Sequence, residues 1–238
     1  MAFAPPFQRP FSATFDRRAA VAAAAGYVID YDGSTSYVNA GSGATIDNLL
    51  NAAMTVETWV WADTLGGFSQ GVVASKGSYQ THWYFGFASG FSFEAKTGDT
   101  FAMVSASAAL SMGGWYHVAG TYDNAGDKKM RLWIAGDLAA TSAAATGTWI
   151  SDAAQNLHIG KLASAANRYW DGRIGWLRIS NNVRYTGAFT PPSRCSAPLS
   201  DANTLLLWRL LEGTGNPQDS SGNANHGTLQ SASWQACS

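Results

Sequence analysis

The strongest constraint on the fold is a pair of aromatic-rich segments joined by a polar turn. Trp115–Tyr122 combines aromatic and β-branched residues in a two-residue alternation. Asp123–Asp127 supplies a polar turn that contains glycine, and Met130–Ile134 has the composition of a returning strand. Because successive side chains of a strand point to opposite faces, this pattern predicts a β-hairpin. The rest of the chain can be arranged around this hairpin.

Short strand-like segments also occur along most of the remaining chain, separated by Gly or polar turns. They are expected at 27–31, 37–39, 54–61, 72–75, 83–87, 91–94, 101–104, 157–160, 172–180 and 204–210. No helical pattern lies between them. This density of strands, with abundant aromatic residues and glycine, favours an all-β fold in which two antiparallel sheets form a jelly-roll sandwich.

Five motifs place this sandwich in a known family. They occur in the order Tyr31–Gly33, Thr55–Val60, Trp115–Ala119, Ile159–Gly160 and Trp170–Ile179. Together they resemble the laminin G-like branch of the concanavalin A-like lectin/glucanase superfamily. The resemblance extends over residues 27–185 and implies a jelly roll, a fold that serves many different functions.

The chain is expected to hold one domain and an extended N-terminal arm. The arm covers 1–26, and the single sandwich covers 27–238. Within the sandwich, 186–204 is predicted to be a connector, and 205–238 a C-terminal strand and tail that complete the sheet beside the strand at 27–31. The arm carries four aromatic residues among prolines, Phe3, Phe7, Phe11 and Phe15. They either fold back onto the sandwich or dock on a protein partner or neighbouring subunit, which would give a homo-oligomer or a larger assembly.

Charge and cysteine content exclude some classes of function and leave others open. The chain has 15 basic and 16 acidic residues and a net charge of −1, so it lacks the basic character of nucleic-acid binders. It has no apolar run of about 18 residues, so no membrane-spanning segment is expected. Cys195 and Cys237 are expected to be free thiols in a reducing compartment, with a disulfide between them as the alternative.

No arrangement of residues suited to catalysis is found. A retaining glycosidase needs two carboxyl groups about 5 Å apart, which a strand provides with residues two or four positions apart. The three glutamates, Glu57, Glu94 and Glu212, have no second carboxylate at such a spacing. The glucanase pattern Glu-x-Asp-x-x-Glu is therefore absent, and no nucleophile elbow or zinc-binding histidine pair is present. The sequence indicates a protein that is not an enzyme.

Two kinds of binding site remain as hypotheses. The family resemblance implies a Ca²⁺ ion at the rim of the sandwich, with Asp32, Asp171 and Asp219 as candidate ligands. The alternative is that these aspartates form turns. Carbohydrate would bind to exposed aromatic rings, for which the candidates are Trp61, Trp83, Trp149 and Trp170. Here the alternative is burial in the core.

Two classes of function follow. The favoured hypothesis is a structural or accessory protein of a phage particle, such as a capsid decoration, tail or fibre component, that is attached by its arm and located in the virion. The alternative is a carbohydrate-binding or adhesion module of a secreted or cell-surface protein. The first rests on the Phe/Pro-rich arm and the absence of catalytic groups, and the second rests on the family resemblance.

Overall fold

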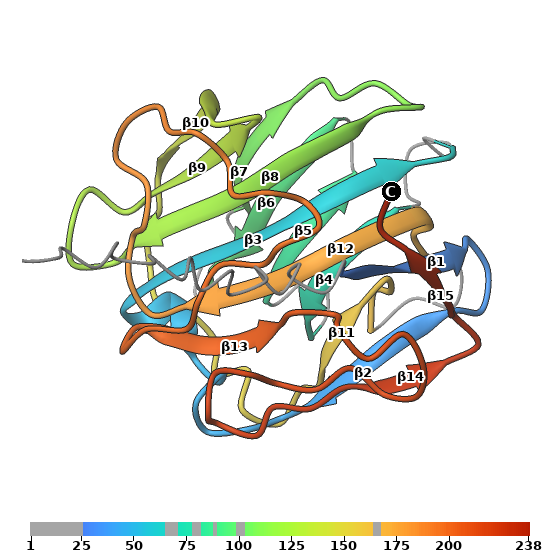
Figure 1. Cartoon of the computed structure of the whole chain (residues 1–238). Coiled ribbons are helices and arrows are strands. Elements are labelled where there is room, and N and C mark those ends of the chain that lie inside the picture. Colours follow the sequence, from blue (N-terminus) through green and yellow to red (C-terminus); the bar gives the residue numbers. More distant parts are fainter. Residues whose placement is uncertain (1–25, 65–70, 78–81, 88–89, 99–102, 164–167) are drawn as a thin grey trace, which may run out of the picture.

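The chain forms a sandwich of two antiparallel β-sheets, as expected (Figure 1). The structure, a computed structural model, describes residues 26–64, 71–77, 82–87, 90–98, 103–163 and 168–238. These residues contain one short 3₁₀ helix, Leu49–Asn51, and no α-helix. In this described part, no helix has the length and apolar character needed to cross a bilayer.

The first sheet, here called sheet A, is built around the predicted hairpin. Its strands lie in the order β10-β9-β8-β3-β12-β1-β15, and β13 also pairs with β12. Their bounds are β1 Tyr27–Asp32, β3 Ala53–Ala62, β8 Trp115–Asp123, β9 Lys129–Ile134, β10 Asp137–Ala144, β12 Asp171–Ser180, β13 Thr204–Trp208 and β15 Ser233–Ala236. The hairpin is β8 and β9, and it places β8 next to β3 near the middle of the sheet.

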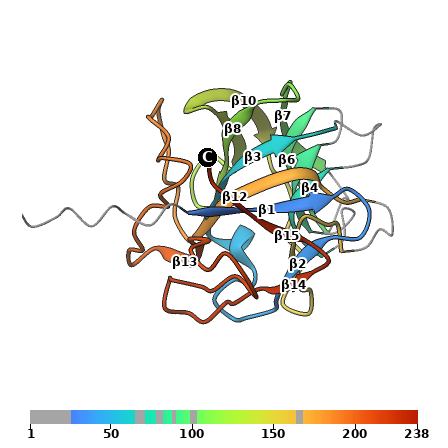
Figure 2. The same cartoon turned by 45° about the vertical axis from the view of Figure 1, so that its right-hand side comes forward.

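The second sheet, sheet B, has the strand order β14-β2-β11-β4-β5-β6-β7. Its strands are β2 Tyr37–Gly41, β4 Val72–Lys76, β5 Trp83–Phe87, β6 Phe91–Lys96, β7 Met103–Ala108, β11 Leu157–Ile159 and β14 Thr228–Gln230. Figure 1 shows its strands β4–β7 behind sheet A, and the turned view of Figure 2 brings β4, β6 and β7 out to the right of β3 and β12. The inward side chains of the two sheets form the main core, which includes Val56 and Val60 from β3 and Phe85 and Phe93 from β5 and β6.

The segment after β12 covers the outer face of sheet A, and we call residues 181–203 the strap. It contains no strand and corresponds to the predicted connector at 186–204, beginning five residues earlier. In Figure 1 it is the orange segment that passes in front of the sheet. Two indole N–H groups on sheet A hold it, because Trp59 donates to the Pro192 carbonyl at 3.0 Å and Trp176 donates to the Ser193 carbonyl at 2.9 Å.

The C-terminal part completes sheet A in two places. The predicted strand at 204–210 forms as β13, but it pairs with the second half of β12 and not with β1. The strand beside β1 is β15, which the sequence pattern did not single out. Both additions lie on the same side of β12, since β1 pairs with its first half. This arrangement places the C-terminal residues next to Gly26, the first described residue.

The expectation of free thiols is wrong, because Cys195 and Cys237 form a disulfide. The two Cα atoms are 5.5 Å apart, a normal separation for such a bond. Gly26 forms backbone hydrogen bonds with both cysteines. Its N–H donates to the Cys195 carbonyl at 3.2 Å, and its own carbonyl accepts from the Cys237 N–H at 2.9 Å. The disulfide therefore joins the strap to the edge strand β15. The predicted arm, with its four phenylalanines at 3, 7, 11 and 15, lies outside the described residues apart from Gly26.

Candidate binding surfaces

The middle of sheet A's outer face holds a buried carboxylate under the strap. Glu57 on β3 is 0% exposed. One of its oxygens accepts hydrogen bonds from Arg178 Nε at 2.7 Å and pairs with Arg178 Nη2 at 2.6 Å. The other accepts the Tyr185 hydroxyl proton at 2.6 Å and lies 3.3 Å from His117 Nε2. Tyr185 belongs to the strap, so this carboxylate links the strap to three strands of the sheet.

The charges around Glu57 keep it ionised. Burial raises the pKa of Glu57, but its interactions with His117 and Arg178 more than offset that effect and hold its pKa below the usual value. The same arrangement raises the pKa of Tyr185, by burial and by the adjacent carboxylate. A carboxylate enclosed in this way has no access to a ligand outside the protein. Glu57 is therefore structural.

A second ion pair joins the two ends of the strap. The Arg184 guanidinium forms a bidentate pair with Asp201, with Nη1 and Nη2 at 2.9 and 2.7 Å from the two carboxyl oxygens. Its Nε donates to Ser180 Oγ at 2.6 Å. Hydrogen bonds from Arg184 hold the pKa of Asp201 well below its usual range. This pair thus joins the two ends of the strap to each other, and the disulfide holds the strap at Cys195 between them.

At the end of the sheet where β8 begins, the strap leaves a row of side chains partly exposed. Asp30, Arg173, Trp61 and Trp115 are successive cross-strand neighbours on β1, β12, β3 and β8, and we call them the tryptophan row. The two indole rings have centroids 6.0 Å apart and are tilted by 58°. Each ring has a guanidinium above it: Arg173 is 5.4 Å from the Trp61 centroid, and Arg194 of the strap is 4.7 Å from the Trp115 centroid.

The guanidinium groups of this row are not fully paired. The Nε atoms of Arg173 and Arg194 are buried and form no hydrogen bond with any part of the chain that the structure describes. Arg173 Nε is 3.6 Å from Asp30 Oδ1, which is beyond hydrogen-bond range. Burial raises the pKa of Asp30, and the charges of Asp63 and Asp171 act in the same direction against Arg173. The row thus combines two aromatic rings with unused donors and nearby carboxylates.

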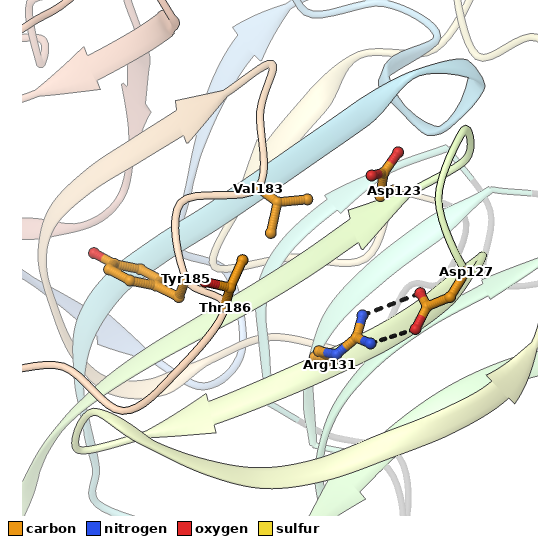
Figure 3. A pocket seen from close by; sticks show the side chains of 6 residues that line it. All are labelled: Asp123, Asp127, Arg131, Val183, Tyr185 and Thr186. Carbon is orange, nitrogen blue, oxygen red and sulfur yellow. Dashed lines mark hydrogen bonds and ion pairs between the residues drawn. The ribbon is translucent and has the colours of Figure 1, made fainter.

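A pocket lies at the opposite end of β8, between the β8–β9 hairpin and the strap (Figure 3). Asp123, Asp127 and Arg131 line it from the hairpin, and Val183, Tyr185 and Thr186 line it from the strap. Its volume is about 260 Å³. Figure 3 shows Arg131 paired with Asp127 through two contacts, while Asp123 stands apart from that pair.

The three aspartates predicted to bind Ca²⁺ do not converge on one point. Asp32 Oδ1 accepts from the backbone N–H groups of Ser34, Thr35 and Ser36 at 2.8–2.9 Å, which is a turn role. Asp219 similarly accepts from the backbone of its own loop, including Ser221 N–H at 2.9 Å.

Asp171 pairs in register with Asp32 and accepts from Thr64 Oγ1 at 2.7 Å, so these two carboxylates are neighbours while Asp219 lies elsewhere. The described residues contain no group of three or more His, Cys, Asp or Glu side chains arranged for a metal ion. The alternative role, turn formation, is visible for Asp32 and Asp219.

Of the four tryptophans predicted to bind carbohydrate, only Trp61 lies in the tryptophan row. Trp83 and Trp170 are each 1% exposed and belong to the core between the sheets, so no sugar ring can stack on them. Trp149 is partly exposed but packs edge-on against Tyr122 and donates its N–H to the Tyr122 hydroxyl at 3.1 Å. The burial alternative applies to Trp83 and Trp170.

The sequence pattern missed Trp115, Arg173 and Arg194 as site residues. Trp115 and Trp61 each lie at the end of a strand that was predicted, but their adjacency depends on the β3–β8 register, which a single sequence does not specify. Arg194 reaches the row only because the strap folds back over sheet A. No local signal in the sequence identifies such a contact.

Comparison with known proteins agrees with this architecture. The profile of the Laminin_G_3 family, described as the concanavalin A-like lectin/glucanases superfamily, matches residues 32–186. The chain belongs to this superfamily. No curated protein sequence matches the chain.

One solved structure shares the fold at low sequence identity, and two others resemble it more weakly. A Bacteroides ovatus protein inferred to bind carbohydrate matches with a TM-score of 0.65 and 14% identity over 90% of this chain. The match covers 60% of that protein, so this superfamily member spans about three fifths of its length. The binding domain of Paraclostridial Mosquitocidal Protein 1 matches with a TM-score of 0.49 and 14% identity over 66% of this chain and 43% of that one. A heptameric pentraxin from Limulus polyphemus gives 0.47 and 14% over 69% and 80%.

Proposed function

We propose that this protein is a glycan-binding module without catalytic activity, and that the tryptophan row is its binding surface. The observation that carries the proposal is the pair of partly exposed indoles, Trp61 and Trp115, with two guanidinium groups beside them. Sugar rings bind proteins through stacking of their apolar faces on aromatic rings, together with hydrogen bonds from a few polar groups to their hydroxyls. The row supplies both kinds of contact on one surface.

Access to the rings involves moving a guanidinium. A cation–π contact at an exposed site contributes only about 0.5–1 kcal/mol. Stacking of a sugar on Trp115 can therefore replace the contact with Arg194, whose Nε has no hydrogen-bond partner among the described residues. The displaced guanidinium would then donate to a sugar hydroxyl. Asp30 and Asp63 offer acceptors at the same surface.

The disulfide supports an oxidising location for this module. Disulfides persist in secreted and cell-surface proteins and are rare in reducing compartments. The pair Cys195–Cys237 therefore favours an extracellular or surface-exposed protein. The fold shared with the Bacteroides ovatus protein agrees with a binding role, although at 14% identity it supports the architecture and not the ligand.

The particle-component hypothesis takes second place. It depended on the arm and its four phenylalanines, which lie outside the described residues. The partners proposed for the arm, a neighbouring subunit or another protein, stay predictions for the same reason. The glycan-binding proposal rests on described side chains.

A glycan array followed by calorimetry tests the proposal. The full chain should bind one or a few glycans, and the variants Trp61→Ala and Trp115→Ala should each weaken that binding by about 30-fold or more, as expected for a central aromatic contact. Leu138→Ala is the matched control, because Leu138 is an exposed apolar residue on β10 outside the row. Circular dichroism checks that each variant is folded. Binding that survives both tryptophan substitutions in folded protein would refute the assignment of the surface, and absence of any binding across the array would refute the function.

A further inference from the structure

We propose that the pocket between the β8–β9 hairpin and the strap is a second sugar site, which takes one hydroxyl-bearing ring and makes the module bivalent. This proposal rests on the glycan-binding function proposed above and adds a second binding site, separate from the tryptophan row. The pocket is formed by described residues of two segments, the hairpin and the strap. Of the six residues that line the pocket, Tyr185 is the one that also bonds to Glu57.

The size of the pocket suits a single ring. Pockets for drug-sized ligands have volumes of about 300–1,000 Å³. This one is slightly smaller, at about 260 Å³, and it is open to the surface between hairpin and strap. Its walls differ in character, since Val183 offers an apolar side chain and the hairpin offers charged ones (Figure 3). A sugar ring has the same combination of an apolar face and a polar edge.

The polar groups of the pocket match hydroxyl groups. Asp127 and Arg131 form an ion pair, so the two side chains together carry no net charge with which to attract an anion. Its interaction with Arg131 also lowers the pKa of Asp127, which keeps that carboxylate ionised. Asp123 Oδ1 accepts from the Ala125 N–H at 3.0 Å, and its second oxygen lies beside Gly126 of the same turn, at the edge of the pocket that Asp123 lines. Thr186 is exposed and supplies a hydroxyl that both donates and accepts.

The two proposed sites lie far enough apart to act independently. Trp115 and Asp123 are the first and last residues of β8 and lie on the same face, because they are eight residues apart. At about 3.3 Å per residue, this separation is about 26 Å. Both sites open on the outer face of sheet A, on either side of the strap. A surface that carries several glycans would therefore be held at two points, which increases the apparent affinity without new contacts.

Nuclear magnetic resonance on the full chain separates the two sites. The indole N–H signals of Trp61 and Trp115 report on the tryptophan row, and the methyl signals of Val183 report on the pocket. The probes are the methyl glycosides of glucose, galactose, mannose and N-acetylglucosamine. We expect at least one of them to shift the Val183 methyl signals in a saturable way.

The variant Asp123→Asn tests the role of the carboxylate. Asparagine keeps the oxygen that accepts from the turn but removes the second acceptor, so the hairpin should persist while binding at Val183 weakens by about tenfold or more. Asp137→Asn, an exposed aspartate at the start of β10, is the matched control and should leave both sites unchanged. Thr186→Ala should weaken binding at Val183 by a smaller factor.

The outcomes distinguish the two proposals. Sugars that shift the indole signals but leave Val183 unaffected would refute the second site and leave the proposed function standing. Shifts at Val183 that persist unchanged in Asp123→Asn would refute the assigned recognition. Shifts at neither place would refute both. Shifts at Val183 that Asp123→Asn abolishes, with the indole signals still responding, would support the second site.

Discussion

The middle of sheet A's outer face and its two ends differ in how completely their polar groups are paired. In the middle, every oxygen of Glu57 has a partner within the chain, and the strap excludes solvent. At the ends, indoles, guanidinium groups and carboxylates are partly exposed, and two guanidinium Nε atoms have no hydrogen-bond partner among the described residues. The paired oxygens indicate a structural role for Glu57, although both ring nitrogens of His117 beside it have no hydrogen-bond partner among the described residues. At the tryptophan row, the guanidinium groups with unpaired Nε atoms lie next to partly exposed indole rings, and this combination indicates a place for a ligand.

Removing the buried carboxylate should have the largest effect and should fall on the covered middle. Glu57→Ala leaves Arg178 buried without its partner, and loss of one member of a buried ion pair typically costs about 3–5 kcal/mol. The free energy of unfolding, measured with urea, should decrease by this amount. The double variant Glu57→Leu with Arg178→Met should lose less, because it removes both charges. Equal losses in the single and double variants would show that the charges do not determine the stability of this region.

Removing the disulfide tests how far the strap depends on its covalent link to the C-terminal residues after β15. Cys195→Ser with Cys237→Ser should lower the free energy of unfolding by about 2–4 kcal/mol. It should also free Arg194, which donates to the Ser238 carbonyl, and so disturb the tryptophan row more than the pocket. Thermal melts with and without reductant measure the loss in the original chain. A reductant that leaves the melting temperature unchanged would contradict this expectation.

Acidification should lower the free energy of unfolding through protonation of the buried carboxylate in the covered middle. The pKa of Glu57 is lower in the folded protein than in the unfolded chain, so ionised Glu57 stabilises the fold above its unfolded pKa, about 4.3. That stability should be lost as the pH falls from there through the folded pKa. The comparison of unfolding free energies at several pH values, in the original chain and in Glu57→Gln, isolates the effect. The variant should show the shallower dependence on pH, and parallel curves would exclude a contribution from Glu57.

Of these treatments, we expect calcium to change the melting temperature least. The carboxyl oxygens of Asp32 and Asp219 already accept backbone N–H groups, so we expect neither Ca²⁺ nor a chelator to change the melting temperature. The two neighbouring carboxylates Asp32 and Asp171 are the place where a shift would arise. Asp171→Asn serves as the check: a calcium-induced shift that this variant abolishes would restore the rim-site hypothesis.

The fold class could be predicted from the sequence because the alternation of side chains along a strand and the composition of turns are local features. The hairpin around Asp123–Asp127 and the long strands β3 and β12 follow from β-branched and aromatic residues with polar turns between them. Three strands were not predicted, β10, β14 and β15. β10 is rich in alanine, which is uncommon in strands, and it was not singled out. β15 is a short edge strand whose pairing with β1 joins residues about two hundred positions apart.

The candidate sites could be predicted only in part, because they depend on register and on the strap. Trp61 was proposed from its place at a strand end, and Trp83 was proposed on the same ground although its ring is in the core. Whether a strand residue is exposed depends on what covers its face of the sheet. The strap covers the middle of sheet A's outer face, which would otherwise be exposed. The pocket needs Val183 and Thr186 opposite Arg131, a contact between segments that only the folded chain brings together.

The hydrogen bonds of Gly26 with both cysteines have a mechanical consequence. The chain enters and leaves the sandwich at one point, since Gly26 donates to the carbonyl of Cys195 and accepts from the N–H of Cys237. A pulling force applied between these two points would load the short clamp formed by Gly26, β15 and the disulfide, and the two sheets would carry little of it. Force applied at these two residues would therefore have to break this clamp before it reached the strands in the middle of the sandwich.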